Sequence, residues 1–329
     1  MKNDCHPAYQ ARINEQLREE AAQFWEALAS QPIREGLRVN TLKLSPETFQ
    51  QLSPFPLNPL LWTKSGFALG ETKSQPGKHP FHAAGVYYLQ EPSAMAVAEI
   101  LAPRPGERIL DLAAAPGGKS THIASLMNNQ GLLIANDPHP KRAQALTRNL
   151  ERWGAHHTTI TTETPNRLAE QFGPFFDRVL VDAPCSGEGM FRKSPRERAQ
   201  WTPNLVERCA AQQDDILWHA ARLVRPGGTL VYSTCTFAPL EDEGTIARFV
   251  EKRPDFEVFP IPKRGGLAPG RPAWGNGNPK LSGAARLWPH LLPGEGHFIA
   301  RLQRSPEASE TQAVQGWQPR PLSRESQSY

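Results

Sequence analysis

The sequence predicts an α/β protein built on a mostly parallel, seven-stranded β-sheet with helices on both faces. Two features of residues 108–302 carry this prediction: short apolar runs recur, and amphipathic segments of helical length separate them. Strands covered on both faces are continuously apolar, and parallel strands need crossover connections between them. The expected strands are 108–112, 132–137, 157–162, 178–182, 229–235, 256–261 and 297–302, and the expected helices are 119–128, 139–153, 205–224 and 240–252.

The N-terminal part of the chain follows a different pattern. Apolar residues recur at helical spacing over 9–31, segment 36–43 is typical of a strand, and 53–90 shows no clear period. A new helix is expected over 91–103, with Pro92 in its first turn. We therefore expect an N-terminal helix and a small α/β region over 1–90, a main domain over 91–303, and a polar, loosely ordered tail over 304–329.

Composition limits the classes of protein that remain. Apolar residues make up 39% of the 329 residues, enough for a core, and the net charge of +4 is compatible with a polyanionic partner. No run approaches the ~20 apolar residues of a membrane span, and the polar start lacks a signal core. The four cysteines form no C-x-x-C pair, which argues against zinc and against a disulfide framework. We expect a soluble, cytoplasmic protein with no metal.

Several chemically useful side chains follow the expected strands directly. In an open parallel sheet, ligands bind at the carboxyl ends of the strands. That rule brings five residues to one rim of the sheet: Asp111, Asp137, Asp182, Cys185 and Cys235.

The segment DLAAAPGGKS (111–120) indicates a loop that holds a cofactor. Its small residues allow close backbone approach, and the helix that follows points free N–H groups at a ligand. Asp137, at the end of the next strand, suits a ribose diol. A phosphate loop would need Gly where Ala113 stands, and G-x-G-x-x-G is absent. A nucleoside cofactor without pyrophosphate, such as S-adenosylmethionine, fits best; a turn that serves only packing is the alternative.

Two of the four cysteines stand just past strand ends, in DAPCS (182–186) and YSTCT (232–236). A buried cysteine is usually a small apolar side chain, and we interpret Cys5 and Cys209 in that way. Beside a methyl donor, Cys185 and Cys235 indicate thiol chemistry. Carbon 5 of a pyrimidine is a weak nucleophile until a thiolate adds to carbon 6, and a base must later remove the carbon-5 proton. This chemistry needs a nucleophile, a carboxyl near ring N3 and a proton acceptor, and Cys235, Cys185 and Asp182 can together supply all three.

These motifs resemble those of the RNA cytosine-C5 methyltransferases of the NOP/NSUN/Rsm superfamily, and most of all the bacterial RsmF-type 16S rRNA enzymes. The pairing of P-C-S-G with S-T-C-T is highly specific to that family. The similar segments span residues 37–302: LRVNTLK (37–43), YYLQEPSAM (87–95), DLAAAPGGKS (111–120), AND (135–137), DAPCSGEGMFRK (182–193), YSTCT (232–236) and GHFIARL (296–302).

The resemblance implies a class I S-adenosylmethionine-dependent methyltransferase, Rossmann-like, preceded by a small RNA-binding region. It implies that Cys235 attacks cytosine C6, that Cys185 assists proton removal and product release, and that Asp182 holds the N3 side of the ring. The cofactor-binding residues that it implies are Ala113, Ala114, Ala115, Pro116, Gly117, Gly118, Lys119, Asp137 and Asp182.

The implied product is 5-methylcytosine in ribosomal RNA, with 16S rRNA, possibly within a small-subunit particle, as the partner of a monomeric enzyme. A tRNA substrate is one alternative, and a non-catalytic RNA-binding or ribosome-assembly factor is another. A DNA cytosine methyltransferase would leave Cys235 without a role. The target base must leave any stack to reach a thiol in a pocket.

Basic residues near the thiols are the candidates for contacting RNA. Arg192, Lys193 and Arg196 directly follow the Cys185 loop, and Arg38 lies in the similar segment 37–43. A solvated surface loop is the alternative for such residues. The Gly/Pro-rich insert 262–280, with cations around Trp274, is a further candidate, whereas His290 and His297 are interpreted as structural.

The sequence departs from the family pattern in two places. Relatives commonly carry an Asp after the third strand, near the adenine amine, where Thr164 stands here beside Glu163. Longer relatives of the RsmF type carry a C-terminal RNA-binding module, whereas here the fold is expected to end near residue 303, and the tail over 304–329 is expected to be either disordered or the start of such a module.

Overall fold

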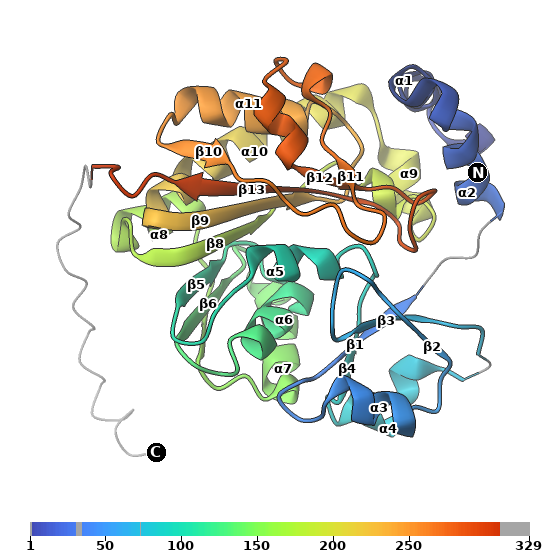
Figure 1. The fold of residues 1–329 in the computed structure, drawn as a ribbon, viewed down its shortest axis with the longest axis vertical. Helices are drawn as coiled ribbons and strands as arrows, with labels where there is room; N and C mark the ends of the chain where they lie inside the picture. The colour runs from blue at the N-terminus through green and yellow to red at the C-terminus, as the bar shows by residue number, and fades with distance from the viewer. Residues whose placement is uncertain (1, 31–34, 73, 310–329) are drawn as a thin grey trace.

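The computed structural model describes residues 2–30, 35–72 and 74–309, which contain two separate β-sheets (Figure 1). The larger sheet has nine strands in the order β11-β12-β13-β9-β8-β5-β6-β7, with β10 also paired to β13. Its parallel part is β7 (Thr158–Thr161), β6 (Leu132–Asn136), β5 (Arg108–Asp111), β8 (Phe176–Asp182) and β9 (Val224–Thr234). The antiparallel part is β13 (His297–Arg304), β12 (Ala285–Leu287), β11 (Ala268–Pro269) and β10 (Phe256–Val258).

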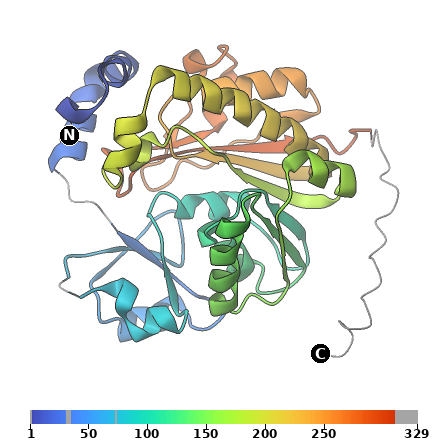
Figure 2. The ribbon, with the colours of Figure 1, turned by 180° about the vertical axis from the view of Figure 1, so that it is seen from behind.

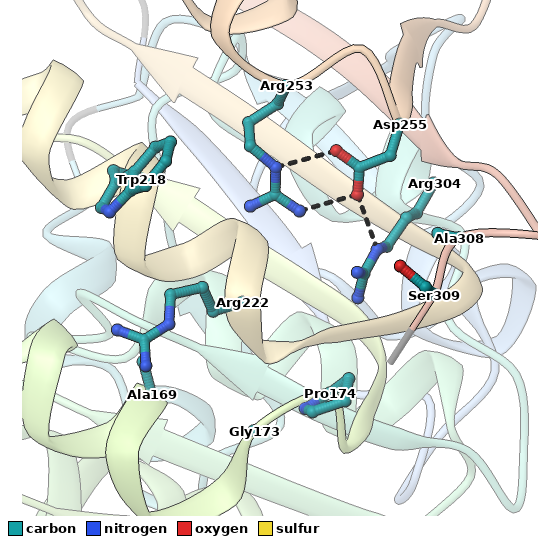
Figure 3. Close-up of a pocket in the computed structure, with 10 residues that line it drawn as sticks. All are labelled: Ala169, Gly173, Pro174, Trp218, Arg222, Arg253, Asp255, Arg304, Ala308 and Ser309. Carbon is teal, nitrogen blue, oxygen red and sulfur yellow. Dashed lines mark hydrogen bonds and ion pairs between the residues drawn. The ribbon is translucent and has the colours of Figure 1, made fainter. Parts of the chain in front are cut away.

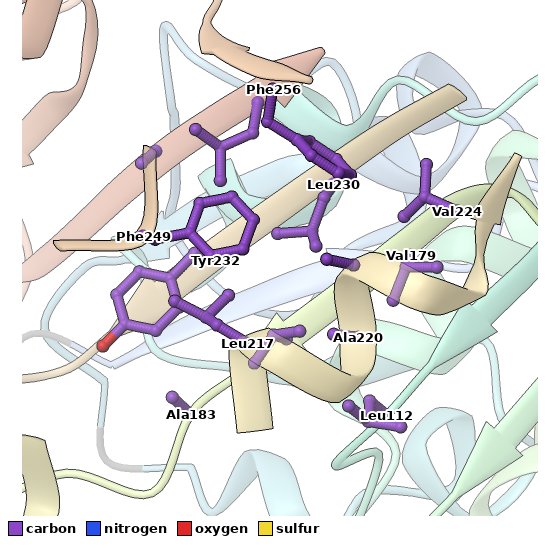
Figure 4. Packing of buried hydrophobic residues seen from close by; sticks show 14 of the residues in the cluster. Leu112, Val179, Ala183, Leu217, Ala220, Val224, Leu230, Tyr232, Phe249 and Phe256 are labelled. Atoms are coloured by element: carbon purple, nitrogen blue, oxygen red, sulfur yellow. The ribbon is translucent and has the colours of Figure 1, made fainter. Parts of the chain in front are cut away.

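Helices cover both faces of this sheet (Figures 1 and 2). One face carries α5 (Met95–Leu101), α6 (Gly118–Leu126) and α7 (Pro140–Trp153); the other carries α8 (Pro165–Phe172), α10 (Pro203–Leu223) and α11 (Glu243–Lys252). Figure 4 shows the second core layer, in which Leu217 of α10 and Phe249 of α11 pack on Leu230 and Tyr232 of β9. Two buried layers on one sheet explain why its strands are continuously apolar.

The prediction of a mostly parallel α/β sheet is confirmed, and all seven expected strands are present. The structure adds two short strands, β11 and β12, and two helices that the sequence pattern did not predict, α8 and α9 (Pro195–Gln200). These elements are two to eight residues long, too short for a clear hydrophobic period.

The prediction of one N-terminal helix over 9–31 is wrong. The segment forms α1 (Pro7–Leu17) and α2 (Ala21–Ser30), joined by a 3-10 turn at Arg18–Glu20, where Arg18 has a φ of 50°. Both helices pack on the main domain: the Phe24 ring lies 5.3 Å from that of Phe237, and the Tyr9 ring 5.1 Å from that of Phe191.

A small antiparallel sheet follows these helices and lies against the α6 side of the main sheet (Figure 1). It has its own apolar core, which includes Leu37, Phe49 and Tyr87. Its strands are three or four residues long, which is why segment 53–90 shows no period. The order is β2 (Leu57–Pro59), β3 (Gly66–Leu69), β1 (Gly36–Val39) and β4 (Tyr87–Leu89), with α3 (Pro46–Leu52) and α4 (Pro80–Ala83) alongside.

Two further expectations concern the C-terminal tail and the absence of a membrane-spanning segment. Strand β13 extends to Arg304, and most of the expected tail, residues 310–329, lies outside the described residues. Within the described residues, no helix has the length and apolar character needed to cross a membrane.

Candidate active site

A cleft of about 800 Å³ opens at the carboxyl ends of β5, β6, β8 and β9. Four of the five side chains that the sequence assigns to one rim line it: Asp137, Asp182, Cys185 and Cys235. The fifth, Asp111, is fully buried at the end of β5. The strand ends meet here because β5, β6, β8 and β9 are parallel neighbours.

The two thiols face each other across this cleft, with 3.4 Å between the Sγ atoms of Cys185 and Cys235. Register brings them together: Asp182 pairs with Ser233 in neighbouring strands, so each cysteine follows two or three residues beyond the same rung. The hydrogen bond with Cys235, together with burial, raises the pKa of Cys185.

An ion pair lies at the same rim, with 2.6 Å between Lys119 Nζ and Asp182 Oδ2. The other carboxylate oxygen of Asp182 accepts a hydrogen bond from Ser233 Oγ at 2.8 Å. Burial alone would raise the pKa of Asp182, but the charges of Lys119 and His297 and these hydrogen bonds lower it. Burial likewise opposes the charge of Lys119, yet Asp182 raises its pKa. A lysine cation therefore stands paired with the Asp182 carboxylate at this rim.

The end of β6 offers a carboxylate oxygen to a ligand. Asp137 Oδ1 accepts from the backbone N–H of His139, whereas the buried Oδ2 accepts no hydrogen bond within the described residues. Arg142 Nη2 lies 3.3 Å from that oxygen and also donates to Ala115 O. Arg142 lines the cleft and was not predicted; its place in the first turn of α7 was the available signal. A ribose hydroxyl suits this oxygen.

Some residues of the loop before α6 line the cleft, and others pack in the interior. Ala113 and Ala115 line the cleft, Ala114 is buried, and Pro116 is exposed. The glycines serve close packing: Gly117 has a φ of 113°, and a Cβ on Gly118 would lie 3.4 Å from the Tyr88 ring. These alanines and Asp137 leave room for a nucleoside at the strand ends. Thr164, where relatives commonly carry an Asp, also lines the cleft.

Two of the four residues expected to contact RNA have buried guanidinium groups that bind other residues of the chain, which argues against a direct contact with RNA. Arg38 is fully buried; its Nη2 donates to Gly118 O and Thr121 Oγ1, and its guanidinium lies 4.6 Å from the Trp153 ring centre. It joins β1 to the start of α6.

Arg192 makes a two-pronged buried pair with Glu295, at 2.7 and 3.0 Å. It also donates to Ala27 O, so it holds the segment after the Cys185 loop against α2. The neighbouring Lys193 is half-buried and Arg196 is exposed, so these two remain candidates for RNA contact.

The acidic segment 241–243 lies in the interior, although its position before α11 is typical of a helix start. Glu241, Asp242 and Glu243 are each fully buried. Burial raises the pKa of Glu241 to about 7. Glu243 pairs with Arg286, which is equally buried. No group of His, Cys, Asp and Glu within the described ranges could hold a metal ion.

A mostly parallel sheet with strands in the order β7-β6-β5-β8-β9-β13, a small-residue loop after β5 and an acid after β6 define a class I methyltransferase. Residues 98–303 match the family described as 16S rRNA methyltransferase RsmB/F, and residues 6–92 match the N-terminal domain of 16S rRNA methyltransferase RsmF. The chain belongs to the RsmB/F methyltransferase family.

The sequence similarity of the chain to curated proteins supports this family assignment. The chain is 37% identical over 290 residues to ribosomal RNA small subunit methyltransferase F of Escherichia coli O139:H28 and of Shigella boydii serotype 18. The match covers 85% of this chain and 59% of each relative, so the chain spans about three fifths of the length of these relatives.

Solved structures show the same architecture. A methyltransferase homolog from Pyrococcus horikoshii superposes with a TM-score of 0.79 at 30% identity, over 90% of this chain and 94% of that one. NSun6 from Pyrococcus horikoshii, solved with SFG, superposes with a TM-score of 0.76 at 23% identity, over 91% and 97%. The second likeness concerns the fold alone.

Proposed function

We propose that this protein is an S-adenosylmethionine-dependent RNA cytosine-C5 methyltransferase that forms 5-methylcytosine in 16S rRNA. The observation that carries the proposal is the 3.4 Å contact between Cys185 and Cys235 in a cleft shared with Asp182. Methylating a pyrimidine at carbon 5 needs a thiolate that adds to carbon 6 and a base that later removes the carbon-5 proton, and two thiols beside a nucleoside-sized site can supply both.

The residues of the cleft fit the cofactor. Asp137 has a buried carboxylate oxygen that accepts no hydrogen bond in the described structure, and it suits the ribose; Ala113 and Ala115 allow close approach. S-adenosylmethionine, when bound, supplies a methyl group on a sulfonium centre.

In the first step the Cys235 thiolate forms a bond to cytosine C6. Electron density moves toward ring N3, where the Lys119–Asp182 pair supplies a proton. Carbon 5 is then enamine-like, and it takes the methyl group with its own electron pair.

Release reverses the addition. Cys185, which lies against Cys235, first gives its proton to solvent and then, as a thiolate, takes the carbon-5 proton directly or through water, while ring N3 returns its proton to the Lys119–Asp182 pair. The C5–H electrons re-form the C5–C6 double bond, and the Cys235–C6 bond breaks to return the thiolate. A thiol with a raised pKa is a strong base once it has lost its proton.

We propose that the enzyme works as a monomer in the cytoplasm, on 16S rRNA or a small-subunit particle, and that the small N-terminal sheet contributes to RNA binding. The support for that region is its position against α6, beside the cofactor loop. Lys193 and Arg196 are the proposed contacts on the other side of the thiols.

The test compares Cys235→Ser with Cys185→Ser, using labelled S-adenosylmethionine and unmodified 16S rRNA, small subunits or tRNA. We expect Cys235→Ser to abolish transfer, and Cys185→Ser to accumulate a denaturation-resistant protein–RNA adduct. An adduct that survives Cys235→Ser but is lost in Cys185→Ser would reverse the two roles. Transfer to tRNA alone would replace the proposed substrate, and no transfer to any of these RNAs would favour an assembly factor.

A further inference from the structure

The carboxylate of Glu241 lies between the two loops that carry the thiols. One oxygen accepts from the backbone N–H of Ser186 at 2.9 Å. The other accepts from Ser186 Oγ and, at 3.3 Å, from Thr236 Oγ1. Ser186 directly follows Cys185, and Thr236 directly follows Cys235. A single side chain therefore holds the residue next to each thiol.

Two more contacts close this arrangement. Ser186 Oγ and Thr236 Oγ1 lie 2.8 Å apart, so the Thr236 hydroxyl can turn its one proton either to Ser186 Oγ or to Glu241. Gln213 of α10 donates to Pro184 O at 2.9 Å and to Glu241 at 3.0 Å, so the Cys185 loop is held from both sides. Ser186, Thr236, Gln213 and Glu241 are buried, whereas Pro184 is exposed.

Helix capping does not account for Glu241. Its carboxylate accepts from Ser186, Thr236 and Gln213, and from no N–H group of α11 among the described hydrogen bonds. These donors are uncharged, and burying a carboxylate without a cation is costly. A short apolar residue would serve packing alone at lower cost.

We propose that Glu241 is a positioning residue that holds Cys185 and Cys235 in register, so that one thiol can act at C5 while the other is bonded to C6. C5 and C6 are neighbouring ring atoms, so the two sulfur atoms must stay close throughout turnover. The catalytic part of this inference rests on the proposed function, whereas the geometric part does not.

The geometric part is tested without RNA by diamide, which takes two electrons and two protons from a pair of thiols and leaves a disulfide. Displacing a reacting group by about 1 Å can cost orders of magnitude in rate. We expect Glu241→Ala to slow Cys185–Cys235 disulfide formation about tenfold. In Glu241→Gln the rate of disulfide formation should stay within about threefold of the wild-type rate. The amide oxygen can still accept from the Ser186 N–H, and the hydroxyls of Ser186 and Thr236 can turn to accept from the amide N–H groups.

Two further variants serve as a second test of the link between the loops and as a control. Thr236→Val removes only the link on the Cys235 side and is expected to slow the disulfide, even if Glu241→Ala fails to fold. Asp214→Asn removes an α10–α11 ion pair with Arg248 that touches neither loop, and it should match the wild type. Equal rates in the wild type, Glu241→Ala and Thr236→Val would overturn the proposal, as would an equal slowing by Asp214→Asn.

The catalytic part is measured with 16S rRNA. Glu241→Ala should lower kcat, raise the fraction of enzyme held as the RNA adduct and lower KM as the adduct accumulates, because release needs both thiols in register. A rise in KM alone would contradict it. If the wild type transfers no methyl group, the proposed function fails while the diamide result still stands.

A second cavity, of about 570 Å³, lies at the opposite end of the main sheet (Figure 3). Three guanidinium groups share it with one carboxylate: Asp255 pairs with Arg253 at 2.7 Å and with Arg304 at 2.9 Å, and Arg222 faces the same space. Trp218 is 47% exposed at its edge. Guanidinium groups beside an exposed indole are the combination that holds the phosphates and bases of single strands.

We infer that this cavity binds a phosphate and an adjacent base of the substrate RNA, away from the target cytosine. Strand β8 pairs with β9 from Phe176 to Asp182, so the cavity lies roughly 20 Å from the thiol end of the sheet, at about 3.3 Å per residue. The inference rests on RNA being the partner, but binding can be measured without methyl transfer.

The probe is fluorescently labelled single-stranded RNA, titrated by anisotropy at several salt concentrations. Arg222→Gln should weaken binding and lower the salt slope by about one, and Trp218→Ala should weaken it about tenfold. The control is Arg167→Gln, an exposed arginine paired with Glu163, which should bind like the wild type. Unchanged affinity and slope in both test variants would overturn the inference, as would a loss of inorganic-phosphate binding with no change in RNA binding.

Discussion

Lys119 Nζ lies 2.6 Å from Asp182 Oδ2, and this ion pair joins the start of α6 to the end of β8. The residues stand 63 positions apart in the chain. Because one belongs to the cofactor loop and the other to the strand before Cys185, their contact ties the methyl-donor side of the cleft to the thiol side.

Replacing Lys119 should shift the acid limb of the pH–activity profile. The charge of Lys119 helps to hold the pKa of Asp182 below its usual range, so Lys119→Gln should raise that pKa, and Asp182 should protonate at a higher pH. We expect kcat to fall about a hundredfold and the acid limb to shift upward. Methyl transfer measured from pH 5 to 9 checks this. An acid limb at the wild-type position would contradict the role of the pair.

Replacing Asp111 should change how stability depends on pH. Burial raises the pKa of Asp111 to about 7, above its unfolded value of 3.8. The folded state therefore binds the proton more tightly, and this stabilisation is complete below pH 4 and is lost as the pH rises through 7. At 1.36 kcal/mol per pKa unit, the loss is at most about 4 kcal/mol.

Asp111→Asn keeps a neutral side chain at every pH, so it should gain stability relative to the wild type between pH 5 and pH 8. Urea unfolding at both values measures the difference. Asp214→Asn, a partly exposed control, should show no such gain. A constant difference between wild type and Asp111→Asn across this range would show that Asp111 titrates normally.

Arg38 and Arg196 should give opposite results. Arg38→Met leaves Gly118 O and Thr121 Oγ1 without a buried donor, so we expect a loss of about 2–4 kcal/mol in the free energy of unfolding and unchanged RNA affinity. Arg196→Gln, at an exposed position, should change stability by less than about 0.5 kcal/mol and weaken RNA binding. Urea unfolding and RNA anisotropy measure both. Weaker RNA binding by a fully folded Arg38→Met would restore Arg38 as an RNA contact.

Asp137→Asn should weaken S-adenosylmethionine binding. The variant loses the carboxylate oxygen proposed to accept a ribose hydroxyl, which is worth about 1–3 kcal/mol, or roughly ten- to a hundredfold in affinity. Calorimetry with S-adenosylmethionine measures this, and the same titration of Asp214→Asn should match the wild type. An unchanged dissociation constant would place the ribose elsewhere in the cleft.

The rim of the main sheet was predictable because it depends on local pattern alone. Apolar runs identify β5, β6, β8 and β9, and parallel strands bring their carboxyl ends to one edge. Asp182, Cys185 and Cys235 follow those runs directly, so their meeting required no knowledge of distant contacts. The short strands of segment 53–90 were not predictable, since three or four residues carry no period.

Local sequence pattern was enough to predict the α/β class, the small-residue loop after β5 and the position of Asp182, Cys185 and Cys235 at one rim of the sheet. Which charged residues face solvent depended instead on contacts between segments far apart in the chain. Arg38 meets Gly118 across 80 positions, Arg192 meets Glu295 across 103, and Glu241 meets Ser186 across 55. A charged residue is buried only where distant partners satisfy it, and a sequence pattern read locally contains no information about those partners.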